Sequence, residues 1–157
     1  MGRVANREMN NLYSSTILLV EDDPGDVFRI QRAFRKTALA SSLEVVTDGE
    51  KAIYYLSGQE PYQDRDRYPL PTLMLLDLKL PRRSGFEVLS WLRNESNLKY
   101  LPVVVLTSSD QEIDIERAYA LGANSYLTKP PAPNALLEMV RVVELYWLSF
   151  NRSLGQE

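Results

Sequence analysis

The 157-residue sequence contains no histidine and no cysteine. The absence of histidine removes the commonest general base, the usual zinc ligand and any phosphohistidine on this chain. The absence of cysteine removes disulfides, a thiol nucleophile and thiolate metal sites, and it is compatible with a reducing compartment. The chemistry of the chain therefore depends on carboxylates, hydroxyls and amines.

Long hydrophobic runs are also absent. None approaches the roughly 20 residues that a membrane-spanning helix needs, and residues 1–15 lack the apolar core of a signal peptide. A formal net charge of -3 argues against nucleic acid as the main partner. We expect one soluble, cytoplasmic domain over residues 16–150, between a flexible N-terminal tail (1–15) and a C-terminal tail (151–157), with no membrane partner.

Short apolar runs alternate five times with segments of helical periodicity. The predicted strands are Ile17–Val20, Leu43–Thr47, Leu73–Leu76, Val103–Leu106 and Ser125–Thr128. The predicted helices lie near Asp26–Thr37, Gly49–Leu56, Gly85–Asn94, Asp110–Leu121 and Pro133–Leu148, with Gly122 ending the fourth. Strands that are apolar throughout indicate a parallel sheet with helices on both faces. We predict an α/β fold with a doubly wound, five-stranded sheet of flavodoxin-like order 2-1-3-4-5.

Four of the apolar runs deliver polar side chains at their C-terminal ends. These side chains are Glu21-Asp22-Asp23, Asp77, Thr107-Ser108 and Lys129. In an open parallel sheet such ends lie along one edge, where α/β folds place their sites. The set predicts a carboxylate pocket for a divalent cation, with a hydroxyl and an ammonium beside it. This combination suits the transfer of a phosphoryl group onto Asp77.

The acidic cluster has two interpretations. Strand side chains alternate in direction, so all three carboxylates cannot share a pocket, but two can where the backbone turns. Close carboxylates repel each other unless a cation lies between them, and Mg²⁺ prefers oxygen ligands. The alternative is a solvated acidic turn in which Asp22 or Asp23 caps the helix after Pro24.

The other three positions have similar alternatives. Asp77 is costly to bury unless it is paired or metal-bound, and as a nucleophile it would form an acyl phosphate. Lys129 could hold Asp77 and later a phosphoryl oxygen. It could also be a surface lysine, although Pro130-Pro131 argues against that; a cis Lys129–Pro130 bond would fix its direction. Thr107 or Ser108 could donate to a phosphoryl oxygen or cap the helix near Asp110.

These segments together resemble the receiver domain of two-component response regulators. They are Leu18–Pro24, Leu76–Pro81 with Gly85, Leu106–Ser108 and Tyr126–Pro130, in the family's order and within residues 16–148. The resemblance implies that Asp77 is the phosphoacceptor, with Thr107, Ser108 and Lys129 around the phosphoryl group. It implies a Mg²⁺ (or Mn²⁺) site in which Asp22 ligates directly and Glu21 acts mainly through water. Asp77 and the backbone carbonyl of Lys79 complete this site, and Tyr126 is a switch that turns inward when Thr107 moves.

A narrower resemblance rests on Asp22–Asp26, Tyr119–Tyr126 and Tyr146–Leu148. These segments are similar to the stand-alone response regulators of cyanobacterial and bacterial phytochromes. The resemblance implies that the phosphoryl donor is a phosphohistidine on a separate sensor histidine kinase of phytochrome type. It also implies a phosphoacceptor signalling protein that assists its own phosphorylation and dephosphorylation, and is not an enzyme in the ordinary sense.

The last predicted helix carries two apolar stripes. Leu136, Val140, Val143 and Trp147 form the first and suit the sheet; Met139, Val142, Tyr146 and Phe150 form the second. A surface helix needs only one stripe. We expect the second to form a symmetric homodimer surface. The alternatives are that it packs under the helix Ile113–Tyr119 or is simply exposed.

Two other functions remain as competing hypotheses. A haloacid-dehalogenase-type phosphatase also uses an aspartate nucleophile with Mg²⁺, but it normally has a second aspartate two residues later, where this chain has Lys79. A phosphate-independent dimeric binding module with the same fold would act through its dimer surface alone. The complete set of Asp22, Asp77, Thr107 and Lys129 argues against that module.

Overall fold

The computed structural model describes residues 15–37 and 41–154, and the predicted N-terminal tail lies almost entirely outside them. Five parallel strands form one sheet in the order β2-β1-β3-β4-β5. Their bounds are β1 Thr16–Val20, β2 Ser42–Val46, β3 Leu73–Leu76, β4 Val103–Thr107 and β5 Ser125–Thr128. Strand number, direction and order confirm the predicted fold class.

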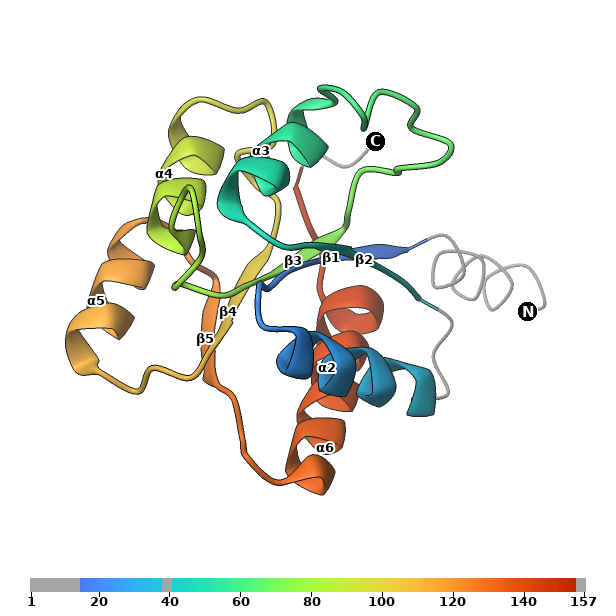
Figure 1. Cartoon of the computed structure of the whole chain (residues 1–157), viewed down its shortest axis with the longest axis vertical. Helices are drawn as coiled ribbons and strands as arrows, with labels where there is room; N and C mark the ends of the chain where they lie inside the picture. The colour runs from blue at the N-terminus through green and yellow to red at the C-terminus, as the bar shows by residue number, and fades with distance from the viewer. Residues whose placement is uncertain (1–14, 38–40, 155–157) are drawn as a thin grey trace.

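Helices cover both faces of this sheet (Figure 1). Helices α2 and α6 lie on one face, and α3, α4 and α5 lie on the other. Their bounds are α2 Pro24–Lys36, α3 Gly49–Ser57, α4 Gly85–Asn94, α5 Glu112–Ala120 and α6 Pro133–Glu144, and the chain continues from α6 as the π-helix η1, Leu145–Phe150. Among the described residues, no helix is long and apolar enough to cross a membrane.

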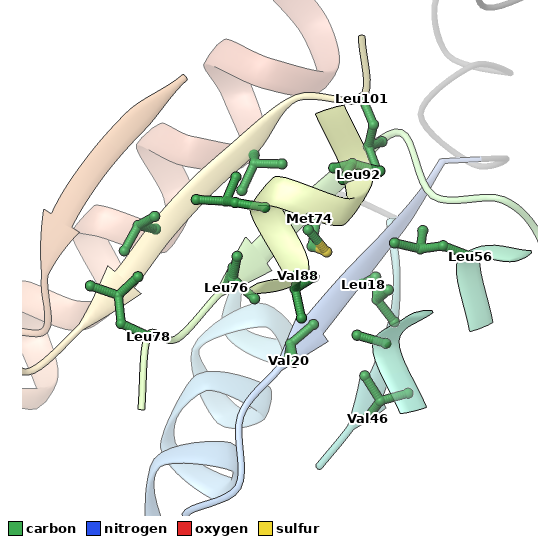
Figure 2. Packing of buried hydrophobic residues seen from close by; sticks show 14 of the residues in the cluster. Leu18, Val20, Val46, Leu56, Met74, Leu76, Leu78, Val88, Leu92 and Leu101 are labelled. Atoms are coloured by element: carbon green, nitrogen blue, oxygen red, sulfur yellow. The ribbon is translucent and has the colours of Figure 1, made fainter. Parts of the chain in front are cut away.

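The strand side chains alternate between two cores. Leu18 and Val20 of β1 point to the face that carries α3 and α4, together with Met74 and Leu76 of β3 (Figure 2). The intervening residues, such as Leu19, point to the face that carries α2 and α6. Every residue of β1, β3 and β4 is buried, which explains why these segments lack an alternating polar pattern.

The register of the sheet places the functional residues side by side. Val20 is level with Val46 on one side and with Leu76 on the other. One residue further, the Asp77 backbone N–H donates to the Val20 carbonyl over 3.1 Å. The acidic turn after β1 and the aspartate after β3 therefore leave the sheet at the same level.

Gly85 brings α4 close to the end of β3. A Cβ atom at this position would lie 2.2 Å from the Asp77 carbonyl oxygen, so no side chain fits without displacing that backbone. The Gly85 N–H donates to the Leu78 carbonyl over 2.9 Å. Ser84 and Glu87 form a capping box that fixes the start of the helix. The backbone that carries Asp77 is thus held by packing and hydrogen bonds from α4.

Arg93 joins three segments at the opposite, amino edge of the sheet. Its guanidinium donates to the carbonyls of Lys99 and Leu101, which precede β4. It also donates to the Gly122 carbonyl and the Asn124 side chain, which precede β5. Gly122 follows the C-cap of α5 with φ 104°, as predicted. The C-terminal end of α4 and the starts of β4 and β5 therefore form one fixed corner.

Two details differ from the sequence prediction. Glu60–Pro61 is the cis bond among the described residues, so the expectation of a cis Lys129–Pro130 bond is wrong. Helix α2 begins at Pro24, two residues earlier than predicted, because Asp23 caps it. The first apolar stripe of the last helix is confirmed, since Leu136 and Val140 are buried in the core.

Candidate functional site

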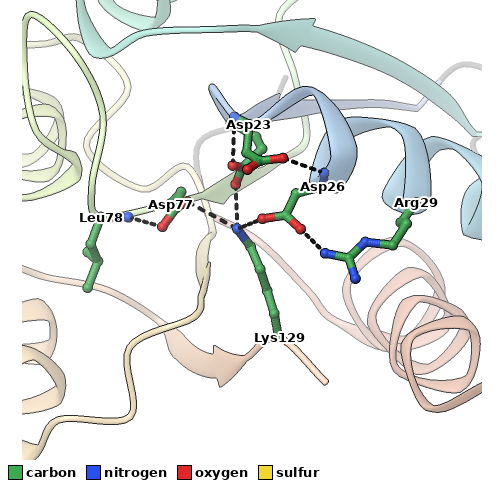
Figure 3. A network of polar contacts seen from close by, with 7 residues as sticks. Asp23, Asp26, Arg29, Asp77, Leu78 and Lys129 are labelled. Atoms are coloured by element: carbon green, nitrogen blue, oxygen red, sulfur yellow. Dashed lines mark hydrogen bonds and ion pairs between the residues drawn. The ribbon is translucent and has the colours of Figure 1, made fainter. Parts of the chain in front are cut away.

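Asp77 is buried directly after β3 and has a partner on each oxygen. Oδ1 accepts the backbone N–H of Leu78 over 2.7 Å, and Oδ2 accepts the Lys129 ammonium over 3.1 Å (Figure 3). The hydroxyl of Thr107 also hydrogen-bonds with Asp77. The carboxylate is therefore held in place at the carboxyl edge of the sheet.

Lys129 reaches this carboxylate from the loop after β5. Its ammonium donates to Glu21 Oε2 over 2.7 Å, to Asp26 Oδ2 over 2.9 Å and to Asp77 Oδ2 over 3.1 Å. Its side chain is 9% exposed, and its backbone N–H donates to the Thr107 carbonyl over 2.7 Å. The interpretation of Lys129 as a surface lysine is therefore wrong.

The acidic turn divides its carboxylates between two tasks. Asp23 caps α2 by accepting the Asp26 N–H over 3.0 Å. Glu21 is buried and faces Lys129, whereas Asp22 is exposed. Oxygens of Glu21, Asp22 and Asp77 nevertheless lie within 4.8 Å of one another. Two carboxylates of the turn thus join Asp77, and this all-oxygen set fits a divalent cation.

Protonation separates the roles of the two buried acids. Burial, together with hydrogen bonding to Asp77, raises the pKa of Glu21 to about 7, although Lys129 opposes the rise. Burial also acts to raise the pKa of Asp77, but hydrogen bonds with Glu21 and Thr107 and the charge of Lys129 outweigh it and lower that pKa. Near neutral pH a proton held by this pair therefore resides mainly on Glu21, and Asp77 is the carboxyl that stays ionised.

Thr107 and Ser108 have different surroundings. Thr107 is buried at the end of β4, whereas Ser108 is exposed. Neither caps the next helix, because the N-cap of α5 is Gln111, which makes no side-chain capping bond. Instead, the Ser109 hydroxyl donates to Asp114 over 2.6 Å. The alternative of Thr107 or Ser108 as a helix cap is therefore wrong, and Thr107 is the hydroxyl next to Asp77.

Tyr126 links β5 to the loop that follows Thr107. Its hydroxyl donates to the Ser109 carbonyl over 2.8 Å. Its ring is partly buried and packs against the core under α3, α4 and α5. Burial raises the pKa of Tyr126, so the hydroxyl remains a donor at neutral pH. The switch role of Tyr126 and the carbonyl ligand role of Lys79 stay predictions.

Sequence reasoning missed Asp26 and Arg29. Asp26 accepts the Lys129 ammonium through one oxygen and pairs with Arg29 through the other (Figure 3). In the sequence, Asp26 is simply an acidic residue in the first turn of a helix, where the helix dipole favours one. No local pattern indicates that a lysine 103 residues further along the chain returns to it.

The second stripe of the last helix is largely exposed. Val142, Tyr146 and Phe150 are 50%, 52% and 68% exposed, so the alternative in which this stripe packs under α5 is wrong. Met139 is half-buried against the core. Together with Leu127 of β5, members of the stripe line a groove of about 520 Å³.

Comparison with known proteins identifies response regulators as relatives of this chain. A family model described as the response regulator receiver domain matches residues 17–141. The probable methanogenesis regulatory protein FilR2 of Methanothrix harundinacea is 41% identical and covers 88% of this chain and 87% of its own. The response regulator Rcp1 of Synechocystis sp. is 39% identical over 84% of this chain and 88% of its own. The crystal structure of its Mn²⁺-bound form aligns with a TM-score of 0.79 at 37% identity, over 90% of this chain and 99% of that one.

A further solved structure is that of the phosphorylated cyanobacterial phytochrome response regulator RcpA. It aligns with a TM-score of 0.82 at 36% identity and covers 90% of this chain and 99% of that one. The structural similarity thus covers nine-tenths of this chain, and the family model spans residues 17–141, which include the strand ends that carry the polar cluster.

Proposed function

Because this chain belongs to the family of response regulator receiver domains, we propose that it accepts a phosphoryl group on Asp77 from a sensor histidine kinase. The observation that carries the proposal is the ionised, buried Asp77 between the Lys129 ammonium and the Thr107 hydroxyl. The chain is a single receiver unit homologous to phytochrome response regulators. A kinase of phytochrome type is the donor that these relatives favour.

The reaction would transfer a phosphoryl group from an imidazole nitrogen of the donor to a carboxylate oxygen of Asp77. A bond forms between an Asp77 oxygen and phosphorus, while the bond from phosphorus to the donor's imidazole nitrogen breaks. The imidazole keeps the electron pair and leaves as the neutral ring when its other nitrogen carries the proton. Lys129 keeps its protons and donates one hydrogen bond to a phosphoryl oxygen, which stabilises the charge on the moving group.

The same strand ends would hold the cation. The ligands would be oxygens of Glu21, Asp22 and Asp77, with the backbone carbonyl of Lys79. When bound, Mg²⁺ or Mn²⁺ supplies positive charge that offsets both the carboxylates and the phosphoryl oxygens. The cation would relieve the repulsion between neighbouring carboxylates. It would have to displace the proton that Glu21 holds when its pKa is raised to about 7, so cation binding should strengthen as the pH rises.

Phosphorylation would then alter the surface formed by α5 and β5. An acyl phosphate on Asp77 gives Thr107 and, nearby, Ser108 a strong acceptor. A shift of Thr107 would pull on the loop whose Ser109 carbonyl holds the Tyr126 hydroxyl. Tyr126 would turn inward as that bond breaks, which shifts the population of a two-state surface. The protein is thus a phosphoacceptor that assists its own chemistry, rather than an enzyme with a separate substrate.

The test is intact mass after incubation with acetyl phosphate and Mg²⁺. We expect a gain of one phosphoryl group that is lost in Asp77→Asn and when EDTA is present. Phosphotransfer from a panel of purified histidine kinases then identifies the donor. A folded, cation-binding protein that gains no phosphate from either source would contradict the proposal. Partner binding that persists in Asp77→Asn would favour a phosphate-independent module instead.

We also propose that the exposed stripe Met139, Val142, Tyr146 and Phe150 forms a homodimer surface. Its three outer side chains are at least half exposed beside an apolar groove, which is an unfavourable arrangement for a monomer. Replacing Tyr146 and Phe150 with glutamate should give a folded monomer by light scattering. The matched control replaces exposed Tyr100 with glutamate and should keep the dimer mass. An unchanged mass for the double variant would contradict the proposal.

A further inference from the structure

Asp26 lies beside the reacting carboxylate but outside the set of oxygens that could share a cation. That set consists of Glu21, Asp22 and Asp77 among the described residues. Asp26 instead accepts the Lys129 ammonium through Oδ2 over 2.9 Å and pairs with Arg29 through Oδ1. The residue thus contacts the functional lysine without contacting Asp77, in the part of the network that Figure 3 shows.

The hydrogen bonds of Lys129 leave no donor unassigned. An ammonium carries three N–H groups, and the three recorded acceptors are oxygens of Glu21, Asp26 and Asp77. When two of these N–H groups are held, the tetrahedral geometry at nitrogen fixes the direction of the third. The third points at Asp77, where the phosphoryl group would be attached.

We propose that Asp26 is a positioning residue for phosphoryl transfer. It anchors the Lys129 ammonium so that one N–H stays aimed at the Asp77 oxygen. This inference rests on the proposed function, and it assigns a task to a residue that neither the cation set nor the reacting group includes. Asp26 acts on the reaction only through Lys129.

The surroundings of Asp26 suit a fixed anchor. Its backbone N–H is held by the Asp23 cap at the start of α2, and Arg29, one turn further, occupies its other oxygen. Glu21 is a less constant anchor, because it also hydrogen-bonds with Asp77 and belongs to the cation set. Asp26 is therefore the acceptor of Lys129 that stays in place when Glu21 and Asp77 take other partners.

The first test is the kinetics of phosphorylation by acetyl phosphate at saturating Mg²⁺, followed by intact mass. Asp26→Asn keeps the size of the side chain but removes its charge. We expect the limiting rate constant to fall about tenfold, corresponding to about 1.4 kcal/mol. The half-saturating Mg²⁺ concentration, measured by calorimetry, should change less than about twofold, because Asp26 is not in the cation set.

Two variants serve as controls. Asp23→Asn alters a carboxylate three residues away that caps the same helix but does not contact Lys129; it keeps a good cap and should retain the wild-type rate. Arg29→Gln removes the second partner of Asp26, and its rate should lie between those of wild type and Asp26→Asn. Thermal unfolding of each variant verifies that it is folded.

The second test measures how firmly the Lys129 ammonium is held, in the absence of any phosphoryl donor. The ¹⁵N-correlated NMR signal of the Lys129 ammonium, assigned by its loss in Lys129→Met, reports how fast its protons exchange with water. Exchange should accelerate at least about fivefold in Asp26→Asn, because one of three charged acceptors is lost. It should be unchanged in Asp23→Asn.

The outcomes separate this inference from the function on which it rests. A wild-type protein that takes no phosphoryl group contradicts the proposed function, whatever the NMR result. A wild-type protein that is phosphorylated at the same limiting rate as Asp26→Asn overturns the positioning role alone. Equal loss of rate in Asp26→Asn and Asp23→Asn also overturns it, since the effect would then arise from the start of α2 in general.

Discussion

Lys129 forms ion pairs with three carboxylates of the site. Our principal prediction concerns the stability of the protein when this ammonium is removed. Replacing Lys129 with methionine keeps the length of the apolar stem and removes the ammonium. Three carboxylates, those of Glu21, Asp26 and Asp77, then lose the cation that contacts all of them. Asp26 retains Arg29, whereas the other two retain no cationic side chain among the recorded ion pairs of the described residues.

The loss of unfolding free energy in Lys129→Met follows from the burial of the carboxylates that the ammonium contacts. The side chains of Glu21 and Asp77 are 1% and 10% exposed, and breaking a buried charge pair by removing one partner costs about 3–5 kcal/mol. Glu21 is partly protonated near pH 7 because its pKa is raised from 4.5 to about 7, which reduces the repulsion. We therefore expect a loss of about 3 kcal/mol at pH 8, at the lower end of that range.

The sign of the pH dependence follows from proton binding. Without Lys129 the raised pKa of Glu21 rises further in the folded protein and the lowered pKa of Asp77 also moves up, because a cation no longer favours their charged forms. A carboxyl whose pKa is higher in the folded than in the unfolded state makes the folded state bind more protons. The stability that Glu21 contributes to the variant should therefore be fully present below the ordinary carboxyl pKa and be lost as the pH rises through its raised value. The deficit relative to wild type should be smaller at pH 5.5 than at pH 8.

Urea denaturation followed by circular dichroism measures both quantities, with Lys99→Met as the control for an exposed lysine. The control should change the free energy of unfolding by less than about 0.5 kcal/mol. Added Mg²⁺ should stabilise the Lys129 variant, since the carboxylates then have a cation again. An equal deficit at pH 5.5 and pH 8, or a variant more stable than wild type at pH 8, would refute the reasoning.

Two further predictions concern the frame around the site. Glu144 is fully buried, and its oxygens accept the hydroxyls of Thr37 and Ser41, each over 2.7 Å. Burial raises the pKa of Glu144 in the folded protein. The protonated Glu144 therefore contributes stability below the ordinary carboxyl pKa, and this contribution is lost as the pH rises through the raised pKa. Glu144→Gln should remove that part of the pH dependence in thermal unfolding between pH 4.5 and 7.5. Gly85→Ala places a Cβ against the Asp77 carbonyl. The free energy of unfolding, measured in urea, should fall by about 2–3 kcal/mol, and phosphorylation should be slower.

Each of these two predictions has its own control and contrary outcome. For Glu144, the control is Glu116→Gln at an exposed position, which should keep the wild-type pH profile. A wild-type slope in Glu144→Gln would contradict the assignment. For Gly85, the control is Ser90→Ala at a half-buried position on the same helix, which should keep the wild-type stability and rate. Wild-type stability of Gly85→Ala would mean that α4 can move away from Asp77 at little cost.

The sequence alone was sufficient for the fold and for the set of strand ends. Strands such as Leu73–Leu76 are apolar throughout because helices cover both faces, and that pattern is local. The C-terminal ends of parallel strands lie along one edge, so the proximity of Asp77 to Glu21 followed from topology. Gly122 was likewise predictable, because its conformation is a local property of a helix end.

Long-range side-chain contacts were not predictable in the same way. Lys129 follows the edge strand β5 and reaches across two strands to acids that follow β1. Its contact with Asp26 therefore depends on side-chain length and on the orientation of α2, neither of which leaves a periodic pattern. The same limit applies to Ser109, whose carbonyl and hydroxyl engage Tyr126 and Asp114.

The Arg93 corner holds the α5–β5 half of the molecule at the end opposite the candidate site. Its guanidinium binds mainly carbonyls at the starts of β4 and β5, so charge screening by salt weakens it little. The opposite ends of the same strands carry Thr107 and Lys129. A displacement at those ends should leave the starts of β4 and β5 in place. We therefore expect α5, which connects these two strands, to tilt rather than to translate.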